Sequence, residues 1–184
     1  VGQKPGLADL YRPFFLTARM CHDLKETEGR GKPAYLGDPM EVALVEMALH
    51  LISGTPVYSR LDEIPFDADR MRLSTLHQAP EGPALYCKGA PETVLPLCQH
   101  ILVDGKIQPL DVELRANIVQ AQDTMAQQGL RVLAFACRKL PVGYDRGKLE
   151  EDLVFTGLAG LEDPPRPEVP EALRKCQEAG IKVI

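Results

Sequence analysis

The stretch Tyr-Cys-Lys-Gly-Ala-Pro-Glu at residues 86–92 marks a corner where a strand is predicted to turn into a helix. The apolar run that leads into it, residues 84–87, is short enough to be a buried strand. The Pro-Glu pair at its end is typical of the first turn of a helix. Lys88 at this corner can reach a phosphate or carboxylate, and Gly89 lets a ligand approach the backbone beside a partly positive helix start. Taken alone, however, the pattern is explained better by a solvated lysine and a glycine that only turns the chain.

Further strands are predicted on both sides of this corner. Residues 70–76 alternate polar and apolar side chains, which predicts a half-buried strand, and residues 67–69 are expected to form a turn. A hairpin-like loop at residues 79–83 should bring the next strand back antiparallel. Residues 130–137 predict another buried strand, with Arg131 near its entrance, where burial without an anionic partner is costly.

Helix signals flank these strands. Asp38 is a natural N-cap, Pro39 fits the first helical position, and Glu41 is placed for a capping box. Glu41 therefore has a structural explanation with which any ligand role must compete. Its helix is expected to bury Met40, Ala43, Leu44, Met47, Ala48 and Leu51. Other helices are predicted over residues 7–21 (with Asp9 as a possible N-cap, and either Pro13 in the first turn or the helix starting at Pro13), 92–98, 110–129 and 170–180, and an exposed loop over residues 25–32.

Composition narrows the functional class. The 184 residues are 45% hydrophobic, enough for one domain with a proper core, or one domain and part of another. A net charge of -5 with no dominant basic patch argues against nucleic-acid binding. No apolar run approaches the roughly 20 residues that span a bilayer. The five cysteines, without zinc-like spacing, indicate a reducing, cytoplasmic setting.

One apparent catalytic trio is rejected. Cys21, His22 and Asp23 are consecutive, and consecutive residues on a helix point in different directions, so they cannot form a nucleophile, base and acid.

The pattern changes near residues 153–163, where a glycine-containing apolar strand is followed by a connection, a helix and the start of another strand. This is a βαβ-type unit, unlike the antiparallel pattern before it. The sequence does not begin with Met and stops within an apolar run, so we expect a piece of a longer protein.

Five short motifs give these separate signals a single interpretation. They are Gly37-Asp38-Pro39-x-Glu41-x-Ala43-Leu44, Pro65-Phe66-Asp67, Lys88-Gly89-Ala90-Pro91-Glu92, Gly129-Leu130-Arg131-Val132-Leu133 and Asp163-Pro164-Pro165-Arg166. They occur in the order found in P-type cation-transporting ATPases. Nearly the whole chain resembles the nucleotide-binding domain of such a pump, and it is more similar to the calcium-pump-like branch than to the heavy-metal branch.

This resemblance implies an α/β fold with a mostly antiparallel twisted sheet flanked by helices. It assigns residues 1–155 to the nucleotide-binding domain. Residues 156–184 would form the hinge return and a fragment of the Rossmann-like phosphorylation domain.

The resemblance also implies a pocket for ATP. Phe66 would stack on the adenine ring, as a flat heterocycle on an aromatic face. Glu41 would accept from the exocyclic amino group, and Lys88 would line the pocket near the adenine and reach toward the phosphates. Arg131 would offer bidentate bonds to the phosphate chain.

Four further residues complete the implied site. Gly89 would permit close packing at the pocket floor, and Leu133 would supply an apolar wall. Asp163 and Arg166 would lie on the hinge strand, nearer the phosphates than the adenine.

The chain departs from the family pattern at two positions. Many relatives carry a basic residue where Met71 stands, and some carry arginine at Ala68. Either Arg70 or Arg72 could compensate, and Arg72 could equally be a solvated surface residue.

The implied function is ATP binding within a membrane pump that couples ATP hydrolysis, with Mg²⁺ on the nucleotide, to cation transport. The family's phosphorylated aspartate lies in an Asp-Lys-Thr-Gly-Thr motif that this sequence lacks, so we expect no catalytic residue and no metal ligand here. Partners would be ATP and the phosphorylation and actuator domains of the parent chain, with the membrane reached only through the parent. Calcium is the first expectation for the ion. A haloacid-dehalogenase-type phosphatase fragment and a regulatory domain with little nucleotide affinity are the alternatives.

Overall fold

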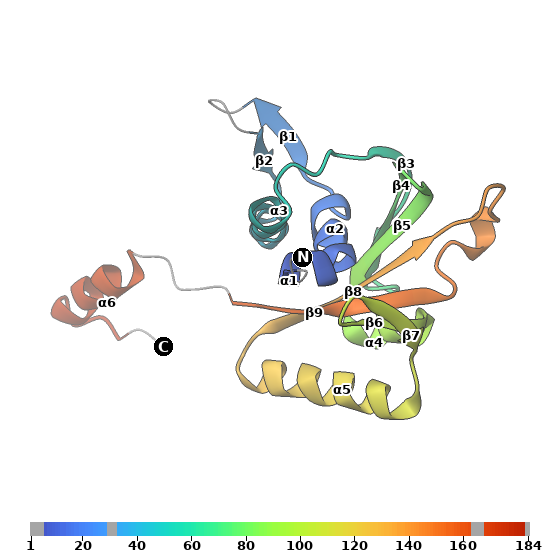
Figure 1. Ribbon diagram of the computed structural model, residues 1–184. Helices are drawn as coiled ribbons and strands as arrows, with labels where there is room; N and C mark the ends of the chain where they lie inside the picture. The colour runs from blue at the N-terminus through green and yellow to red at the C-terminus, as the bar shows by residue number, and fades with distance from the viewer. Residues whose placement is uncertain (1–5, 29–32, 163–167, 183–184) are drawn as a thin grey trace.

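The computed structural model describes residues 6–28, 33–162 and 168–182 (Figure 1). The helices are α1 (Leu7–Leu10), α2 (Arg12–Met20), α3 (Pro39–Leu51), α4 (Pro91–Val94), α5 (Val112–Gln127) and α6 (Val169–Glu178), with 3-10 turns at Leu95–Leu97 and Arg146–Lys148. The strands are β1 (Lys25–Glu28), β2 (Pro33–Leu36), β3 (Ser59–Asp67), β4 (Arg72–Ala79), β5 (Gly82–Gly89), β6 (Cys98–Val103), β7 (Lys106–Pro109), β8 (Arg131–Lys139) and β9 (Leu153–Leu161).

Seven strands form one sheet in the order β3-β4-β5-β8-β9-β6-β7, and β1 pairs with β2 in a separate ribbon. Within the large sheet only β6 and β9 run parallel, and the other neighbours are antiparallel. The predicted fold class, a mostly antiparallel sheet with flanking helices, is confirmed.

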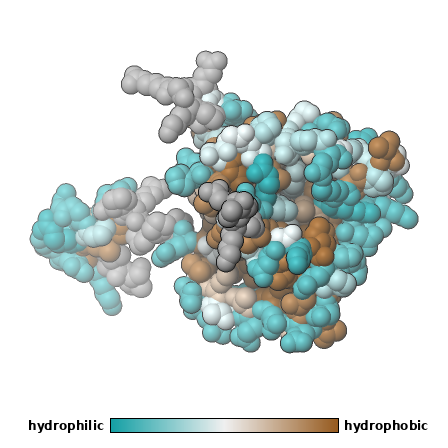
Figure 2. Space-filling view, viewed as in Figure 1, coloured by the Kyte–Doolittle hydropathy of each residue, from teal (hydrophilic) through white to brown (hydrophobic). Residues whose placement is uncertain are grey.

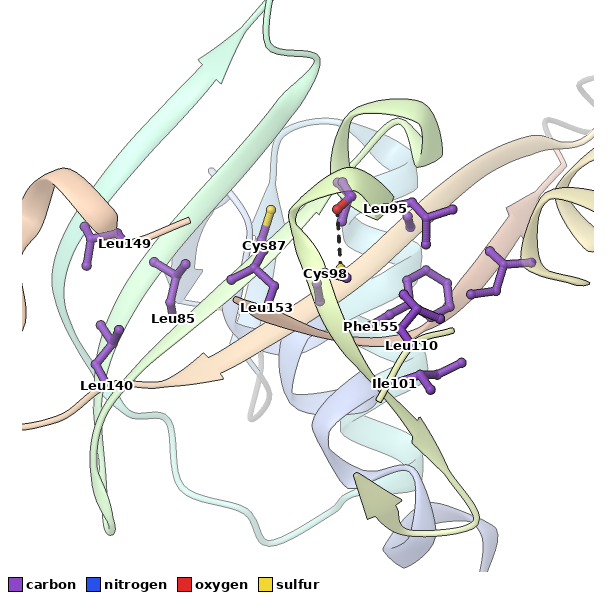
Figure 3. Packing of buried hydrophobic residues seen from close by; sticks show 14 of the residues in the cluster. Leu85, Cys87, Leu95, Cys98, Ile101, Leu110, Leu140, Leu149, Leu153 and Phe155 are labelled. Atoms are coloured by element: carbon purple, nitrogen blue, oxygen red, sulfur yellow. Dashed lines mark hydrogen bonds between the residues drawn. The ribbon is translucent and has the colours of Figure 1, made fainter. Parts of the chain in front are cut away.

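Helices cover both faces of the sheet, and strand β8 shows why (Figure 1). Successive side chains of a strand point to opposite faces. The fully buried Phe135 packs with α2 and α3, whereas Ala134 and Ala136 belong to the cluster formed with α4 and α5. Figure 3 shows this second cluster, in which Cys98 donates its S–H to the carbonyl of Val94.

Cap residues set the limits of the helices that face the sheet. The Asp38 carboxylate accepts from the Met40 N–H at 2.8 Å, and Pro39 begins α3, as predicted. Asp111 caps α5 in the same way, accepting from the Leu114 N–H at 2.8 Å. Gly129 follows α5 with a φ of 78°, the left-handed conformation typical of the residue after a helix.

Several local predictions were wrong. Asp9 lies inside α1 and accepts from Gly6 N–H, while the predicted long helix breaks at Tyr11 and resumes as α2 with Pro13 in its first turn. Residues 25–28 form β1 instead of a loop, because their backbone groups find partners in β2.

The buried faces of two elements also differ from the prediction. Strand β4 is buried at every position from 73 to 77, because the end of α2 covers one of its faces and the segment around Leu149 and Glu150 covers the other. On α3, Val45 is buried, whereas Ala43 and Leu51 are exposed, because the helix is rotated relative to the expected stripe.

The C-terminal region contains the predicted strand and helix, as β9 and α6. All of β9 belongs to the large sheet, including residues 156–161. The division of the chain at residue 155 and the assignment of its last part to a phosphorylation domain stay predictions. Among the described residues, no helix combines the length and apolar character that crossing a bilayer requires. Figure 2 shows a mainly hydrophilic surface interrupted by separate hydrophobic patches.

The N-cap of α5 can be tested by comparing two variants of the same helix. Asp111→Ala should lower the free energy of unfolding by about 1 kcal/mol, because the Leu114 N–H loses its acceptor. Asp123→Ala, on an exposed turn of the same helix, should cost nothing because alanine has the higher helix propensity. Urea denaturation of both variants measures the difference. Equal stabilities would show that the cap does not contribute.

Candidate functional site

A cavity of about 420 Å³ opens between the start of α3, the β3–β4 hairpin and the adjoining ends of β5 and β8. This volume lies in the range of small-molecule sites. Six of the eight predicted binding residues line it: Glu41, Phe66, Lys88, Gly89, Arg131 and Leu133. The other two, Asp163 and Arg166, lie outside the described residues. Residues far apart in the sequence therefore surround one space.

The strand register explains how β5 and β8 form one wall of the cavity. Lys88 is paired with Phe135 in the antiparallel ladder, so both side chains point to the α3 face. Leu133 and Arg131 lie two and four residues before Phe135 and share that face. The cavity thus has an apolar wall at Leu133 and a cation at its mouth, where Arg131 is exposed.

A buried ion pair lies at the base of the cavity. Lys88 is only 6% exposed, and its Nζ lies 2.6 Å from Glu41 Oε1. The other carboxylate oxygen of Glu41 accepts from the Asp23 N–H at 3.1 Å. Glu41 therefore uses its carboxylate to hold Lys88 and Asp23, and the predicted capping-box role is replaced by these contacts. The solvated Lys88 of the plainer interpretation was wrong.

The Lys88 ammonium keeps N–H groups that can still donate hydrogen bonds. Its contact with Glu41 is a close ion pair outside good hydrogen-bond geometry, and no other described residue accepts a hydrogen bond from it. A buried ammonium carries three donors, and unmet donors are costly in a site of low dielectric. An acceptor entering the cavity would relieve that cost.

Phe66 forms an aromatic edge of the cavity and is 63% exposed. It lies on the edge strand β3, where the register slips between Ile64 and Asp67 because β3 has one residue more than β4. Such a bulge bends the strand and re-aims its side chains. A large aromatic side chain so exposed beside a cavity is suited to stacking on a flat ligand.

Gly89 is required by the hairpin beside it. A Cβ on Gly89 would lie 2.4 Å from the carbonyl oxygen of Met71 and 2.7 Å from Cα of Arg72. The Ala90 N–H donates to the same Met71 carbonyl at 2.9 Å. The close packing expected at this glycine is thus a backbone contact between β5 and the start of β4.

Neither arginine near Met71 is available as a substitute cation. Arg70 and Arg72 both bind Glu150, with Nη2–Oε distances of 2.5 and 2.8 Å. Arg72 points to the sheet face opposite Lys88, since its neighbour Leu73 is the residue paired with Lys88. Its side chain is 17% exposed, so the solvated interpretation was wrong too.

Glu150 is a further residue of this region that the sequence analysis did not single out. Its carboxylate also accepts from the Ser74 hydroxyl at 2.7 Å. No motif marks it, because its partners lie 76 to 80 residues away in the chain.

The consecutive Cys21, His22 and Asp23 are not a catalytic group. Burial raises the pKa of the Cys21 thiol to about 11, and the thiol donates to the carbonyl of Leu73. Burial, with Arg60 and Lys88 nearby, lowers the pKa of His22 to about 4, so it is neutral near pH 7. Its Nδ1 accepts from the Leu24 N–H. The thiol and imidazole are used in packing and turn formation.

The cavity lining is acidic overall. Four carboxylates, those of Asp23, Asp38, Glu41 and Glu63, face two cations, Lys88 and Arg131. Within the described ranges, no cluster of three His, Cys, Asp or Glu residues could hold a metal ion.

Comparison with known families shows which family the chain belongs to. Residues 11–168 match the family described as P-type ATPase, cytoplasmic domain N. The chain belongs to this family. The match covers every described residue of the cavity and most of the chain.

Individual relatives agree. The chain is 40% identical to the cation-transporting ATPase pma1 of Synechocystis, over 97% of its own length and 20% of the relative. It is 38% identical to a calcium-transporting ATPase of Bacillus cereus, over 80% of its own length and 17% of the relative. It is 37% identical to the sodium/potassium-transporting ATPase subunit alpha-2 of the rat, over 80% of its own length and 16% of the relative. The chain thus spans about a fifth of the length of these relatives.

The contact at Gly89 can be tested directly. Gly89→Ala should lower the free energy of unfolding by about 1–3 kcal/mol, because the new methyl group meets backbone that cannot move aside freely. Gly6→Ala is the control, since its Cβ would have only an ordinary contact of 3.7 Å with Asp9. Thermal unfolding of the two variants checks the difference. An unchanged transition in Gly89→Ala would show that the hairpin relaxes.

Proposed function

We propose that this chain is the ATP-binding cytoplasmic domain of a P-type ATPase, an integral membrane pump that couples ATP hydrolysis to cation transport. The observation that carries the proposal is the cavity, which collects an exposed aromatic ring, a carboxylate, a buried lysine and an arginine from four separate elements. The names of the relatives support the transport function of the parent, with calcium first among the candidate ions.

The part of the cavity between Phe66, Leu133 and the Glu41–Lys88 pair is suited to adenine. Phe66 offers a ring face for stacking, and Leu133 an apolar wall. The Glu41 carboxylate can accept from the exocyclic amino group, while Lys88 can donate to a ring nitrogen and extend toward the phosphates. Because Glu41 and Lys88 are already paired, they are held in place before the base arrives.

The phosphates belong at the mouth of the cavity, where Arg131 is exposed. The carboxylates of the lining oppose a bound anion, so they favour an orientation with the triphosphate directed outward. Asp163 and Arg166 would lie on this side in the assembled pump. Mg²⁺ would be carried by the triphosphate and would neutralise part of its charge.

The chain on its own is proposed to bind nucleotide without hydrolysing it. The sequence contains no Asp-Lys-Thr-Gly-Thr motif, so the phosphoryl acceptor would come from the phosphorylation domain of the parent chain. The actuator domain would be the other cytoplasmic partner. A regulatory domain with little nucleotide affinity is the second candidate, favoured by the acidic lining and by Met71 in the position of a cation.

Stacking by Phe66 is tested by its removal. ATP titration followed by amide chemical shifts should give saturable changes at Phe66, Lys88 and Arg131. Phe66→Ala should weaken binding by about 1–3 kcal/mol, which is about 5- to 150-fold in Kd. Ile107→Ala, which shortens a similarly exposed apolar side chain on β7, should leave Kd unchanged. No shifts at millimolar ATP would instead support the regulatory alternative.

The proposed orientation is tested by comparing two ligands. Arg131→Ala should weaken ATP binding by about 1 kcal/mol, about fivefold in Kd, because an exposed charge pair with phosphate is lost. Adenosine, which has no phosphate, should bind this variant and the natural sequence equally. Calorimetric titration of both ligands, with Lys106→Ala as an exposed-cation control, measures the ratio. Equal losses for ATP and adenosine would contradict an outward triphosphate.

A further inference from the structure

We propose that Glu150 is a positioning residue for the nucleotide pocket, which it supports from the opposite face of the sheet. Through Arg70 and Arg72 it would hold the β3–β4 turn so that Phe66 and Met71 stay at the edge of the cavity. The inference rests on the proposed nucleotide binding and extends it to a residue outside the cavity lining.

The contacts of Glu150 form a two-sided clamp. Oε1 accepts from Arg70 Nη2 at 2.5 Å and from the Ser74 hydroxyl at 2.7 Å, and Oε2 accepts from Arg72 Nε at 3.0 Å and Nη2 at 2.8 Å. The Glu150 side chain is only 13% exposed. A largely buried carboxylate with four charge-assisted or hydroxyl bonds holds its partners in fixed geometry.

Arg70 carries this restraint to the pocket. Its Nη1 donates to the carbonyl of Pro65 at 3.3 Å, directly before Phe66, while its Nη2 binds Glu150. Arg70 therefore connects the bulge that re-aims Phe66 to a residue 80 positions away in the chain. Arg72 adds a bond to the carbonyl of Arg70 at 3.3 Å.

The turn needs such an external anchor. It is closed internally by Asp67, whose carboxylate accepts from the N–H groups of Asp69 and Arg70, so it can move as a unit. Its Met71 end is held by Ala90 through a backbone bond. Its Phe66 end lies on the edge strand β3, one side of which has no neighbouring strand among the described residues. Arg70 and Glu150 supply the anchor at that end.

Because the contacts of Glu150 lie on the opposite face of the sheet, they do not occupy the cavity. Glu150 and its neighbour Leu149 lie on the face of the α4–α5 cluster, whereas Lys88 and Leu73 face α2 and α3. Arg70 and Arg72 thus hold the wall of the pocket, and their guanidinium groups bind Glu150 instead of a phosphate.

The experiment compares Glu150→Gln with Glu151→Gln in the 184-residue chain. Glu150→Gln keeps the side-chain shape and removes the charge that holds both arginines, whereas Glu151 is an exposed neighbour. If the bound position of the turn is then populated about 10–20% of the time, Kd for ATP should rise about five- to tenfold. Arg70→Ala should weaken ATP similarly, because it cuts the same connection to Pro65.

A readout without nucleotide separates this inference from the proposed function. The chain has five phenylalanines, so 4-fluorophenylalanine labelling gives five ¹⁹F resonances, and Phe66→Leu assigns that of Phe66. Glu150→Gln should shift or broaden the Phe66 resonance and leave that of the buried Phe135 unchanged. If the natural sequence does not bind ATP, the proposed function fails while this positioning effect is still measured.

Three results would overturn the proposal. Tighter ATP binding by Glu150→Gln would mean that Glu150 only withholds arginines that bind phosphate once released. An unchanged Phe66 resonance together with an unchanged Kd would mean that the turn keeps its position without the clamp. A general loss of structure would instead change the Phe135 resonance and would also contradict a role confined to the turn.

Discussion

The ion pair between Lys88 and Glu41 is the interaction on which the rest of the site depends. It joins the third strand of the sheet, β5, to the first turn of α3, and it fixes both groups beside the cavity between α3, the β3–β4 hairpin and the ends of β5 and β8. A buried ammonium without a carboxylate would be costly, so the pair constrains how α3 lies on the sheet. The same pair presents an acceptor and a donor side by side, which is the pattern that the edge of a purine needs.

The two faces of the sheet have different tasks. The face toward α2 and α3 carries the cavity, and the opposite face carries the larger apolar cluster and the Glu150 network. Strands β4 and β5 serve both because their side chains alternate. Leu73 and Lys88 point to the cavity, while Ser74 and Arg72 point away. The two faces therefore share the strands that carry the cavity lining.

The charge of the cavity fits a site that releases its ligand. Only Lys88 and Arg131 are cationic among the described lining residues, and Lys88 is already neutralised by Glu41. If the chain binds ATP as proposed, its affinity would come mainly from stacking and shape around the nucleobase, which do not change when the terminal phosphate is transferred. Under this proposal, a nucleotide held mainly by its nucleobase could be delivered to another domain and exchanged afterwards.

The sequence by itself determined the family, the strands and helices that carry the five motifs, and six residues that share one cavity, because short motifs and local periodicity encode these features. It also located the Asp38 cap and the corner at residues 86–92. Only the tertiary structure decided that Glu41 binds Lys88 instead of closing a capping box, that Arg70 and Arg72 are held by Glu150, and that Gly89 is required by Met71. The physical reason is the same in each case: the partners are far apart in the chain, and only strand register and helix packing determine which groups meet.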